Sequence, residues 1–256
     1  MQIWESVRIS LRALTVNKMR SILTMLGIII GVGAVIALLS VGQGFEQYIT
    51  QQFQSLGTNL LFVFAGQLES SGPGSARSSQ QRIQPLTMGD ASALADPFLV
   101  PDVVAVAPEY SRSATVVRGK LDRSANVSGV TPEYQSVRNF NPVLGEFIAQ
   151  EHVNGRSRVA VLGATVAEEF FEPDEYPIGQ TIKLNDVPFK VIGVLEEKGG
   201  GGFGDEDNVV MIPISTAQTR LYNAGSVRGD LIISVIFVQV ATQDKMGAVA
   251  DRIAEV

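Results

Sequence analysis

The longest apolar segment of the chain lies near its N-terminus. Residues 22–41, with the sequence ILTMLGIIIGVGAVIALLSV, contain no charged side chain. A helix rises 1.5 Å per residue, so this segment reaches about 30 Å, the thickness of the hydrocarbon core of a bilayer. We therefore predict a membrane-spanning helix. The alternative is a cleaved signal peptide, but its apolar region has about 7–15 residues and ends at a small-residue cleavage site, whereas this segment runs into Gly42-Gln43-Gly44-Phe45.

The charges on the two sides of the span predict its orientation. Glu5 is the one acidic residue before the span, and the segment from Gly42 to Ala76 contains no lysine or arginine. The cationic residues before the span are Arg8, Arg12, Lys18 and Arg20. Because positive charge is retained on the cytoplasmic side, the N-terminus is expected in the cytoplasm and the chain beyond the span outside it.

Helical spacing is also present on both sides of the span. Residues 1–21 form an apolar stripe opposite Arg8 and Arg12, which predicts an amphipathic helix on the inner membrane surface whose basic face binds anionic lipid or a cytoplasmic partner. Beyond the span, apolar residues again recur at helical spacing up to Gly57. We expect residues 42–57 to form a stalk helix that continues the span rigidly, with the apolar positions Phe45, Ile49, Phe53 and Leu56.

The remaining chain alternates between strand and helix patterns. Strands are predicted at 59–64, 103–107 and 115–117, and a hairpin at 182–194 turns at Asn185-Asp186. Thr87 with Asp90 forms a capping-box pattern that starts a short helix. The last predicted helix has the apolar stripe Met246, Val249, Ile253 and Val256. Because the chain stops inside this pattern, we expect a truncated protein.

Composition narrows the function classes. The 256 residues are 45% hydrophobic and 18% charged, with a net charge of −6 and no cysteine. A disordered chain, a disulfide scaffold and a cysteine zinc module are excluded, and the acidic balance argues against a nucleic-acid partner. The low charge and high apolar content instead agree with a membrane-anchored globular protein.

Few residues suggest chemistry. Gly199, Gly201 and Gly204 match G-x-G-x-x-G, but the acidic run 205–207 and a strand follow, where a dinucleotide loop needs a helix N-terminus and no adjacent anions. We interpret the glycines as a flexible tip between strands and the acids as a solvated face, with a hard-cation site as the minor alternative. His152, the one histidine, is interpreted as an exposed loop residue. We predict no catalytic residue, metal or cofactor in this chain, and no enzyme activity.

Small residues inside the span predict helix packing. Gly27 and Gly31 form a G-x-x-x-G pattern, and Gly33 with Ala37 extends the small-residue face. Small residues let a second helix approach closely within a membrane. The alternative is chance, because glycine is common in membrane helices. If the pattern is functional, it implies a homodimer or partner helices.

Several sequence blocks, taken in order, resemble the MacB-type ABC transporter permeases, an FtsX-like family. At the start, residues 17–21 lead into LTMLGIIIGVGAVIAL, and SLGTNLLFV follows at 55–63. Three further blocks are similar to the family's extracytoplasmic core: VAVLGATVAEEFF at 159–171, PIGQTIKLNDVPFKVIGVLEEKG at 177–199 and PISTAQTRL at 213–221.

The resemblance implies an α+β architecture with one N-terminal membrane helix and a two-part extracytoplasmic domain. Residues 1–21 would be the cytoplasmic helix, 22–41 the span and 42–57 the stalk. A porter-like βαβ part would comprise residues 58–120 and 226–256, and a small α/β part would be inserted at 121–225. In the family three more membrane helices follow, and their absence here again implies truncation.

The resemblance also implies a function: a permease subunit of an ABC-type export or mechanotransmission complex in the bacterial inner membrane. ATP would be bound by a separate ABC subunit, whose hydrolysis moves the outer domain through the stalk. The family forms dimers, and some members meet a periplasmic adaptor. From the residues alone, a single-pass membrane-anchored binding or sensing module remains the alternative.

Overall fold

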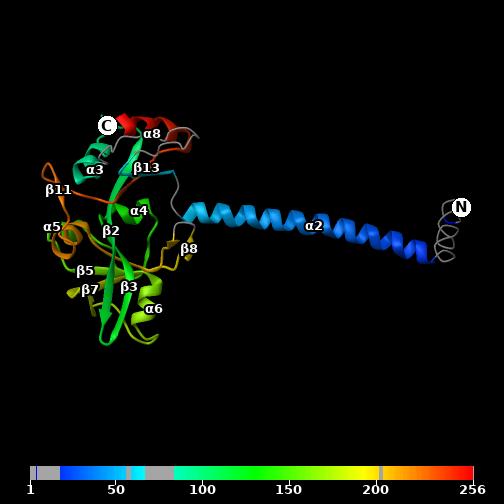
Figure 1. Ribbon diagram of the computed structural model, residues 1–256, viewed down its shortest axis with the longest axis horizontal. Coiled ribbons are helices and arrows are strands. Elements are labelled where there is room, and N and C mark those ends of the chain that lie inside the picture. Colours follow the sequence, from blue (N-terminus) through cyan, green and yellow to red (C-terminus); the bar gives the residue numbers. More distant parts are fainter. Residues whose placement is uncertain (1–3, 5–17, 56–58, 67–83, 202–203, 256) are drawn as a thin grey trace, which may run out of the picture. The chain divides into compact units, whose positions relative to one another are not determined.

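The computed structural model describes residues 4, 18–55, 59–66, 84–201 and 204–255 (Figure 1). The chain divides into two units, residues 1–51 and 52–256.

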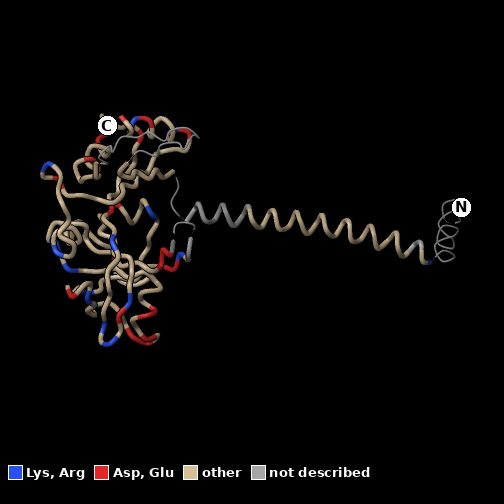
Figure 2. Tube along the Cα trace, in the orientation of Figure 1, with Lys and Arg blue, Asp and Glu red and all other residues tan. Residues whose placement is uncertain are grey.

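Helix α2 (Lys18–Ser55) is one uninterrupted helix of 38 residues. Within it, Ile22–Phe45 is long and apolar enough to cross a membrane, and its side chains are exposed all round. Figure 2 shows no charged residue along this segment. A helix of a soluble protein buries an apolar stripe, so a surface that is apolar on every side is one that lipid can cover. The predicted span is thus helical, and the helix continues beyond Val41 to Ser55.

The second unit is built on a nine-stranded sheet. Eight strands follow one another in space: β1 (Leu60–Phe64), β13 (Val235–Val240), β2 (Val103–Arg118), β3 (Leu121–Val130), β10 (Val209–Pro213), β5 (Val159–Leu162), β7 (Val187–Leu195) and β4 (Pro142–Gly145). The ninth, β6 (Thr181–Leu184), pairs with both β2 and β7. Because β6 joins these two strands, the ring β2-β3-β10-β5-β7-β6 closes on itself as a small barrel.

Strand β2 belongs to both parts of the sheet. Residues 103–109 pair with β13, residues 109–118 pair with β3, and 116–117 also pair with β6. The strands predicted at 103–107 and 115–117 are confirmed, but they are parts of one strand. The sequence PEYSRSA between them lacks an apolar strand pattern and is held in the sheet by its neighbours β13 and β3. The proposed division at 120/121 falls in the β2–β3 turn and stays a prediction.

Short helices and hairpins surround the sheet. The capping box at Thr87 is confirmed, since the Asp90 amide donates to the Thr87 hydroxyl (3.3 Å) and the Thr87 amide donates to the Asp90 carboxylate (2.8 Å). The helices are α3 (Met88–Leu94), α4 (Glu133–Val137), α5 (Gln150–Asn154), α6 (Ala164–Phe170), α7 (Ile214–Thr216), the π-helix η1 (Ala217–Leu221), the 3-10 helix η2 (Gln243–Lys245) and α8 (Met246–Glu255). The small hairpins are β8 (Gly200–Gly201) with β9 (Gly204–Asp205), and β11 (Ser226–Val227) with β12 (Asp230–Leu231).

The predicted hairpin at 182–194 is confirmed as β6 and β7. Asn185 and Asp186 both have positive φ angles, 44° and 69°, which is the backbone of the turn that matches strand twist. The barrel interior next to it is fully buried and apolar, with Val116, Leu162, Ile182, Leu184, Phe189 and Ile212.

The two faces of the β1-β13-β2 region are covered differently. On one face Leu94 of α3 and Val249 of α8 join Ile236 and Val238 in a buried apolar cluster. The opposite face carries aromatic side chains and packs against Tyr134 and Phe140 from α4 and the segment after it, in a second cluster. The candidate site lies on this opposite face.

Candidate functional site

The structure places the predicted membrane-packing residues on α2 without bringing them to another element. A Cβ atom added at Gly27, Gly31 or Gly33 would meet nothing within 4 Å. In a regular helix the pair Gly33/Ala37 is centred about 120° around the axis from the pair Gly27/Gly31. The four residues therefore form two small-residue stripes, and the expectation of one continuous face was wrong.

The other residues singled out along the N-terminal region are described only in part. Lys18 and Phe45 have exposed side chains on α2. The helix also contains Arg20, Ile49 and Phe53. The positions outside the described residues are Arg8, Arg12 and Leu56.

A cavity of about 360 Å³ opens in the second unit, beside the junction of the barrel with the β1-β13-β2 region. Its walls come from β1, β2, β3, β10, β13, α4 and the segment after α4, and from the acidic residues at the end of β9 and directly after it. The lining contains both charged and aromatic side chains. Its charged members are Glu109, Arg138, Asp205 and Glu206, and its aromatic members are Phe62, Phe64, Tyr134, Phe140 and Phe237.

A buried carboxylate lies in the cavity wall on β2. Glu109 is 6% exposed, and it accepts hydrogen bonds from the Ser128 hydroxyl (2.6 Å) and the Tyr134 hydroxyl (2.9 Å). The β2–β3 pairing and the packing of α4 on β2 bring these three residues together. Burial, and then the Glu109 charge, raise the pKa of Tyr134 well above its usual range. Tyr134 therefore stays a hydrogen-bond donor to Glu109 at every ordinary pH.

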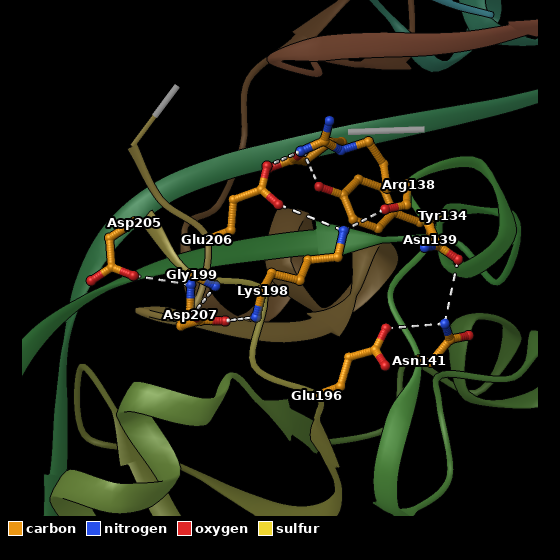
Figure 3. Close-up of polar contacts among 11 residues, drawn as sticks. Tyr134, Arg138, Asn139, Asn141, Glu196, Lys198, Gly199, Asp205, Glu206 and Asp207 are labelled. Atoms are coloured by element: carbon orange, nitrogen blue, oxygen red, sulfur yellow. Dashed lines mark hydrogen bonds and ion pairs between the residues drawn. The ribbon is translucent and has the colours of Figure 1, made fainter. Parts of the chain in front are cut away.

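An ion cluster borders the cavity and contributes Arg138 and Glu206 to its lining (Figure 3). Glu206 pairs with Arg138 at 2.8 Å and with Lys198 at 3.6 Å, and the Lys198 ammonium also donates to the Arg138 carbonyl (2.7 Å). The three side chains are only 5–11% exposed. Desolvation lowers the pKa of Lys198, although the nearby Glu206 charge opposes this effect. Two cations thus share one carboxylate in a largely dry environment.

The neighbouring acids fix the start of the glycine segment. Asp207 is buried and accepts hydrogen bonds from the backbone amides of Lys198 (2.9 Å) and Gly199 (2.7 Å). Asp205 in turn accepts from the Asp207 amide (3.0 Å). The interpretation of residues 205–207 as a solvated face holds for Asp205, which is exposed, but was wrong for the other two acids. Glu206 pairs with the two cations, and Asp207 accepts from the backbone amides at the start of the glycine segment.

Aromatic rings surround the two cations. The Arg138 guanidinium lies 4.8 Å from the centre of the Phe237 ring, and the Lys198 ammonium lies 3.8 Å from that of Phe140. Phe237 also meets Phe62 edge-on at 5.2 Å. Such rings attract cations through their negative faces and keep water away. Electrostatic interactions between charged groups are therefore stronger in this cavity than in bulk water.

Sequence reasoning missed Glu109, Tyr134, Arg138 and Lys198. They come from separate parts of the sequence and match no motif, and only the tertiary fold brings them together. His152 was also misplaced: it lies in α5, largely buried, and its Nδ1 accepts from the Ala149 amide at 3.1 Å. The described residues contain no group of three or more His, Cys, Asp or Glu side chains that could hold a metal ion.

Comparison with known proteins assigns the chain to a family. The model of the MacB-like periplasmic core domain matches residues 21–256, nearly the whole chain. This chain belongs to the MacB-like periplasmic core domain family. Because the family is defined by a periplasmic domain and α2 contains a candidate span, the chain is a membrane protein of the permease family with an extracytoplasmic domain.

Curated relatives of this MacB-like chain are exporters by name. It is 39% identical to the macrolide export ATP-binding/permease protein MacB of Bdellovibrio bacteriovorus over 211 residues. This matched stretch is 82% of this chain and 32% of that protein. The MacB of Hyphomonas neptunium is 36% identical over 222 residues, 86% of this chain and 33% of that protein. A pyoverdine export ATP-binding/permease protein, PvdT of Pseudomonas syringae, is 32% identical over 222 residues, 86% of this chain and 32% of that protein. The chain thus spans about a third of the length of these relatives.

Solved structures agree with the MacB-like fold. The periplasmic region of MacB from Actinobacillus actinomycetemcomitans matches with a TM-score of 0.61 and 26% identity, over 79% of this chain and 84% of that one. The extracellular domain of the ABC-type transporter YknZ from Gram-positive bacteria matches with a TM-score of 0.59 and 18% identity, over 77% of this chain and 91% of that one, and shows the fold alone. The predicted α+β class, with an N-terminal apolar helix and a sheet-rich domain, is confirmed.

Proposed function

We propose that the chain is part of a permease subunit in an ABC-type export or mechanotransmission complex. In this role it couples ATP hydrolysis by a separate cytoplasmic ATP-binding subunit to movement of the extracytoplasmic domain. The N-terminus lies in the cytoplasm of a bacterium, the span crosses the inner membrane, and the sheet-rich unit lies outside. Export of a substrate and binding of a periplasmic adaptor would be properties of the intact complex.

The observation that carries this proposal is the continuity of α2. The helix has 38 residues, about 57 Å at 1.5 Å per residue, and extends from Lys18 through the candidate span to Ser55. Beyond Phe45 it continues for ten residues, 46–55, nearly three turns. An unbroken helix resists bending because every turn is closed by backbone hydrogen bonds. Displacement at its cytoplasmic end can therefore reach the domain that follows.

The decisive experiment follows the domain while ATP is hydrolysed. These 256 residues contain no cysteine, so Phe98→Cys, at a side chain that is 95% exposed, adds one spin-label site to them once any cysteines elsewhere in the transporter have been replaced by serine. In the intact dimeric transporter in nanodiscs, the label-to-label distance is measured with and without ATP. We expect the distance distribution to shift with ATP. An ATP-binding subunit that cannot hydrolyse ATP is the control, and an unchanged distribution during active hydrolysis would contradict coupling and favour a passive binding module.

We also propose that the stripe of Gly27 and Gly31 packs against a membrane helix in the dimer. Exchanging both for leucine, Gly27→Leu with Gly31→Leu, fills the space through which a second backbone approaches, so we expect the dimer fraction in nanodiscs to fall sharply. Val32→Leu, on the helix face away from both small-residue stripes, is the matched control and should leave the dimer intact. Native mass spectrometry gives the dimer fraction. An unchanged fraction in the double variant would refute packing at this stripe.

A further inference from the structure

Strand β2 joins the barrel to the β1-β13-β2 region, and one residue marks the joint. Glu109 is in register with Val235 on β13 and with Val130 on β3, so pairing with β13 ends where pairing with β3 begins. Ser234 extends the pairing at this point, because its amide donates to the Glu109 carbonyl (2.8 Å) and its hydroxyl accepts from the Ser111 amide (3.0 Å). A strand by itself twists over a range of angles, so one fixed geometry needs further contacts.

Those contacts come from β3, α4 and β13. The Glu109 carboxylate accepts hydrogen bonds from Ser128 on β3 (2.6 Å) and from Tyr134 on α4 (2.9 Å). The Tyr134 ring meets Phe237 of β13 edge-on, with ring centroids 5.5 Å apart. Arg138, which follows α4, places its guanidinium 4.8 Å from the centre of the same Phe237 ring. Because β13 pairs with β2, these contacts form a closed path from β2 through α4 to β13 and back to β2.

The burial of the polar groups on this path indicates a geometric role. Glu109 is 6% exposed, and Arg138 pairs at 2.8 Å with Glu206, which lies directly before β10 of the barrel and is also buried (Figure 3). Desolvation offsets much of what a buried carboxylate gains from its partners, so an apolar side chain of similar volume often serves stability equally well. Hydrogen bonds add direction, because each requires a narrow range of distance and angle, whereas purely apolar packing loses rigidity before it loses stability.

We propose that this buried network is a rigid joint, which fixes the barrel at one angle to the β1-β13-β2 region. The joint consists of Glu109, Ser128, Tyr134, Arg138 and Glu206. Four residues, 56–59, separate α2 from β1 in the sequence, so a displacement of α2 reaches the domain at β1. With the joint intact, the barrel follows β1 as part of one body. The inference deepens the proposed coupling and rests on it for this mechanical role, whereas the rigidity itself is measured without ATP.

The test measures the distance between the two ends of β2. Phe98→Cys, in the segment before β2, and Lys120→Cys, in the β2–β3 turn, place two spin labels at exposed positions. The 16 residues of β2 span about 50 Å at 3.3 Å per residue, which pulsed electron double resonance can measure. The full chain is studied in nanodiscs, with labelled copies diluted by unlabelled chain so that only label pairs within one copy contribute. We expect one narrow distance distribution.

A triple variant removes the hydrogen-bonding groups around Glu109 together. Glu109→Leu with Ser128→Ala and Tyr134→Phe leaves no unpaired polar side chain among these three positions, so it should fold with stability close to that of the wild type. We expect its distance distribution to broaden at least about twofold, because apolar packing alone does not set the angle. Tyr134→Phe alone keeps the ring on Phe237 and should broaden the distribution less. Thr216→Val, which removes a fully buried hydroxyl away from the joint, is the matched control and should change nothing.

Each outcome bears on the joint by itself. The proposal is overturned if the wild-type distribution is already broad, or if folded Tyr134→Phe gives a distribution as narrow as that of the wild type. Equal broadening by Thr216→Val would also contradict it, because the loss of any buried hydroxyl would then loosen the domain. If the wild type is narrow and the variants are broad, the joint is supported, even where ATP drives no movement of the label at position 98; that second result would contradict the coupling alone.

Discussion

Gln47→Pro is expected to abolish the ATP-driven movement of the extracytoplasmic domain while ATP hydrolysis continues. Gln47 lies just beyond the candidate span, inside the uninterrupted helix α2. Proline removes the hydrogen bond to the carbonyl four residues earlier and clashes with it, at a cost of about 3 kcal/mol or more. The helix would then kink between the membrane and the domain, and a kinked connection absorbs displacement instead of transmitting it.

The measurement is the spin-label distance at position 98 described above, together with the rate of ATP hydrolysis. Gln47→Ala is the matched control, because alanine favours helix and should preserve both readouts. If Gln47→Pro moves with ATP as the wild type does, continuity of α2 is not what couples the two sides of the membrane. Loss of hydrolysis as well as movement would instead mean that the helix is needed for assembly, which also contradicts a purely mechanical role.

Glu206→Gln is expected to lower the free energy of unfolding by about 3–5 kcal/mol, because it removes the carboxylate that pairs with both Arg138 and Lys198. The side chains of all three residues are at most 11% exposed, so water cannot replace the lost charge. Chemical denaturation of the full chain, followed by circular dichroism, gives the difference. Glu197→Gln, at an exposed glutamate, should change it by no more than about 0.5 kcal/mol. Equal stabilities of the two variants would show that the buried cluster does not support the fold.

The same variant has a predictable pH dependence. Burial lowers the pKa of Lys198, and Glu206 opposes this shift, so Glu206→Gln should lower the pKa further. As the pH rises from neutral toward the usual pKa of lysine, Lys198 therefore loses its proton in the folded variant before it does so in the unfolded chain. The unfolded chain then holds more protons, so the free energy of unfolding of the variant rises with pH. We expect the stability gap between wild type and variant to narrow over this range. A gap that widens would contradict a buried, desolvated Lys198.

Local patterns predicted the elements whose stability is decided within a few residues. The capping box at Thr87 and the turn at Asn185-Asp186 could be predicted because the contacting groups are adjacent in sequence. The apolar span was predictable for a related reason, since twenty consecutive residues without charge suit a lipid environment whatever the rest of the chain does. The glycine–acid segment was misinterpreted, because Glu206 and Asp207 turn inward to partners in the segments that follow α4 and β7, which meet only in the folded chain.

By itself, the sequence determined a membrane-spanning helix followed by an α+β domain, and its block order determined the resemblance to MacB-type permeases. Only the tertiary structure decided that β2 is one strand shared by two parts of the sheet and that β6 closes the barrel. It also decided that Glu109 is buried between hydroxyls while Glu206 holds two cations. The physical reason is range: helix formation, caps and turns depend on neighbours within about four residues, whereas strand pairing and the burial of charge depend on residues that meet only when the chain has folded.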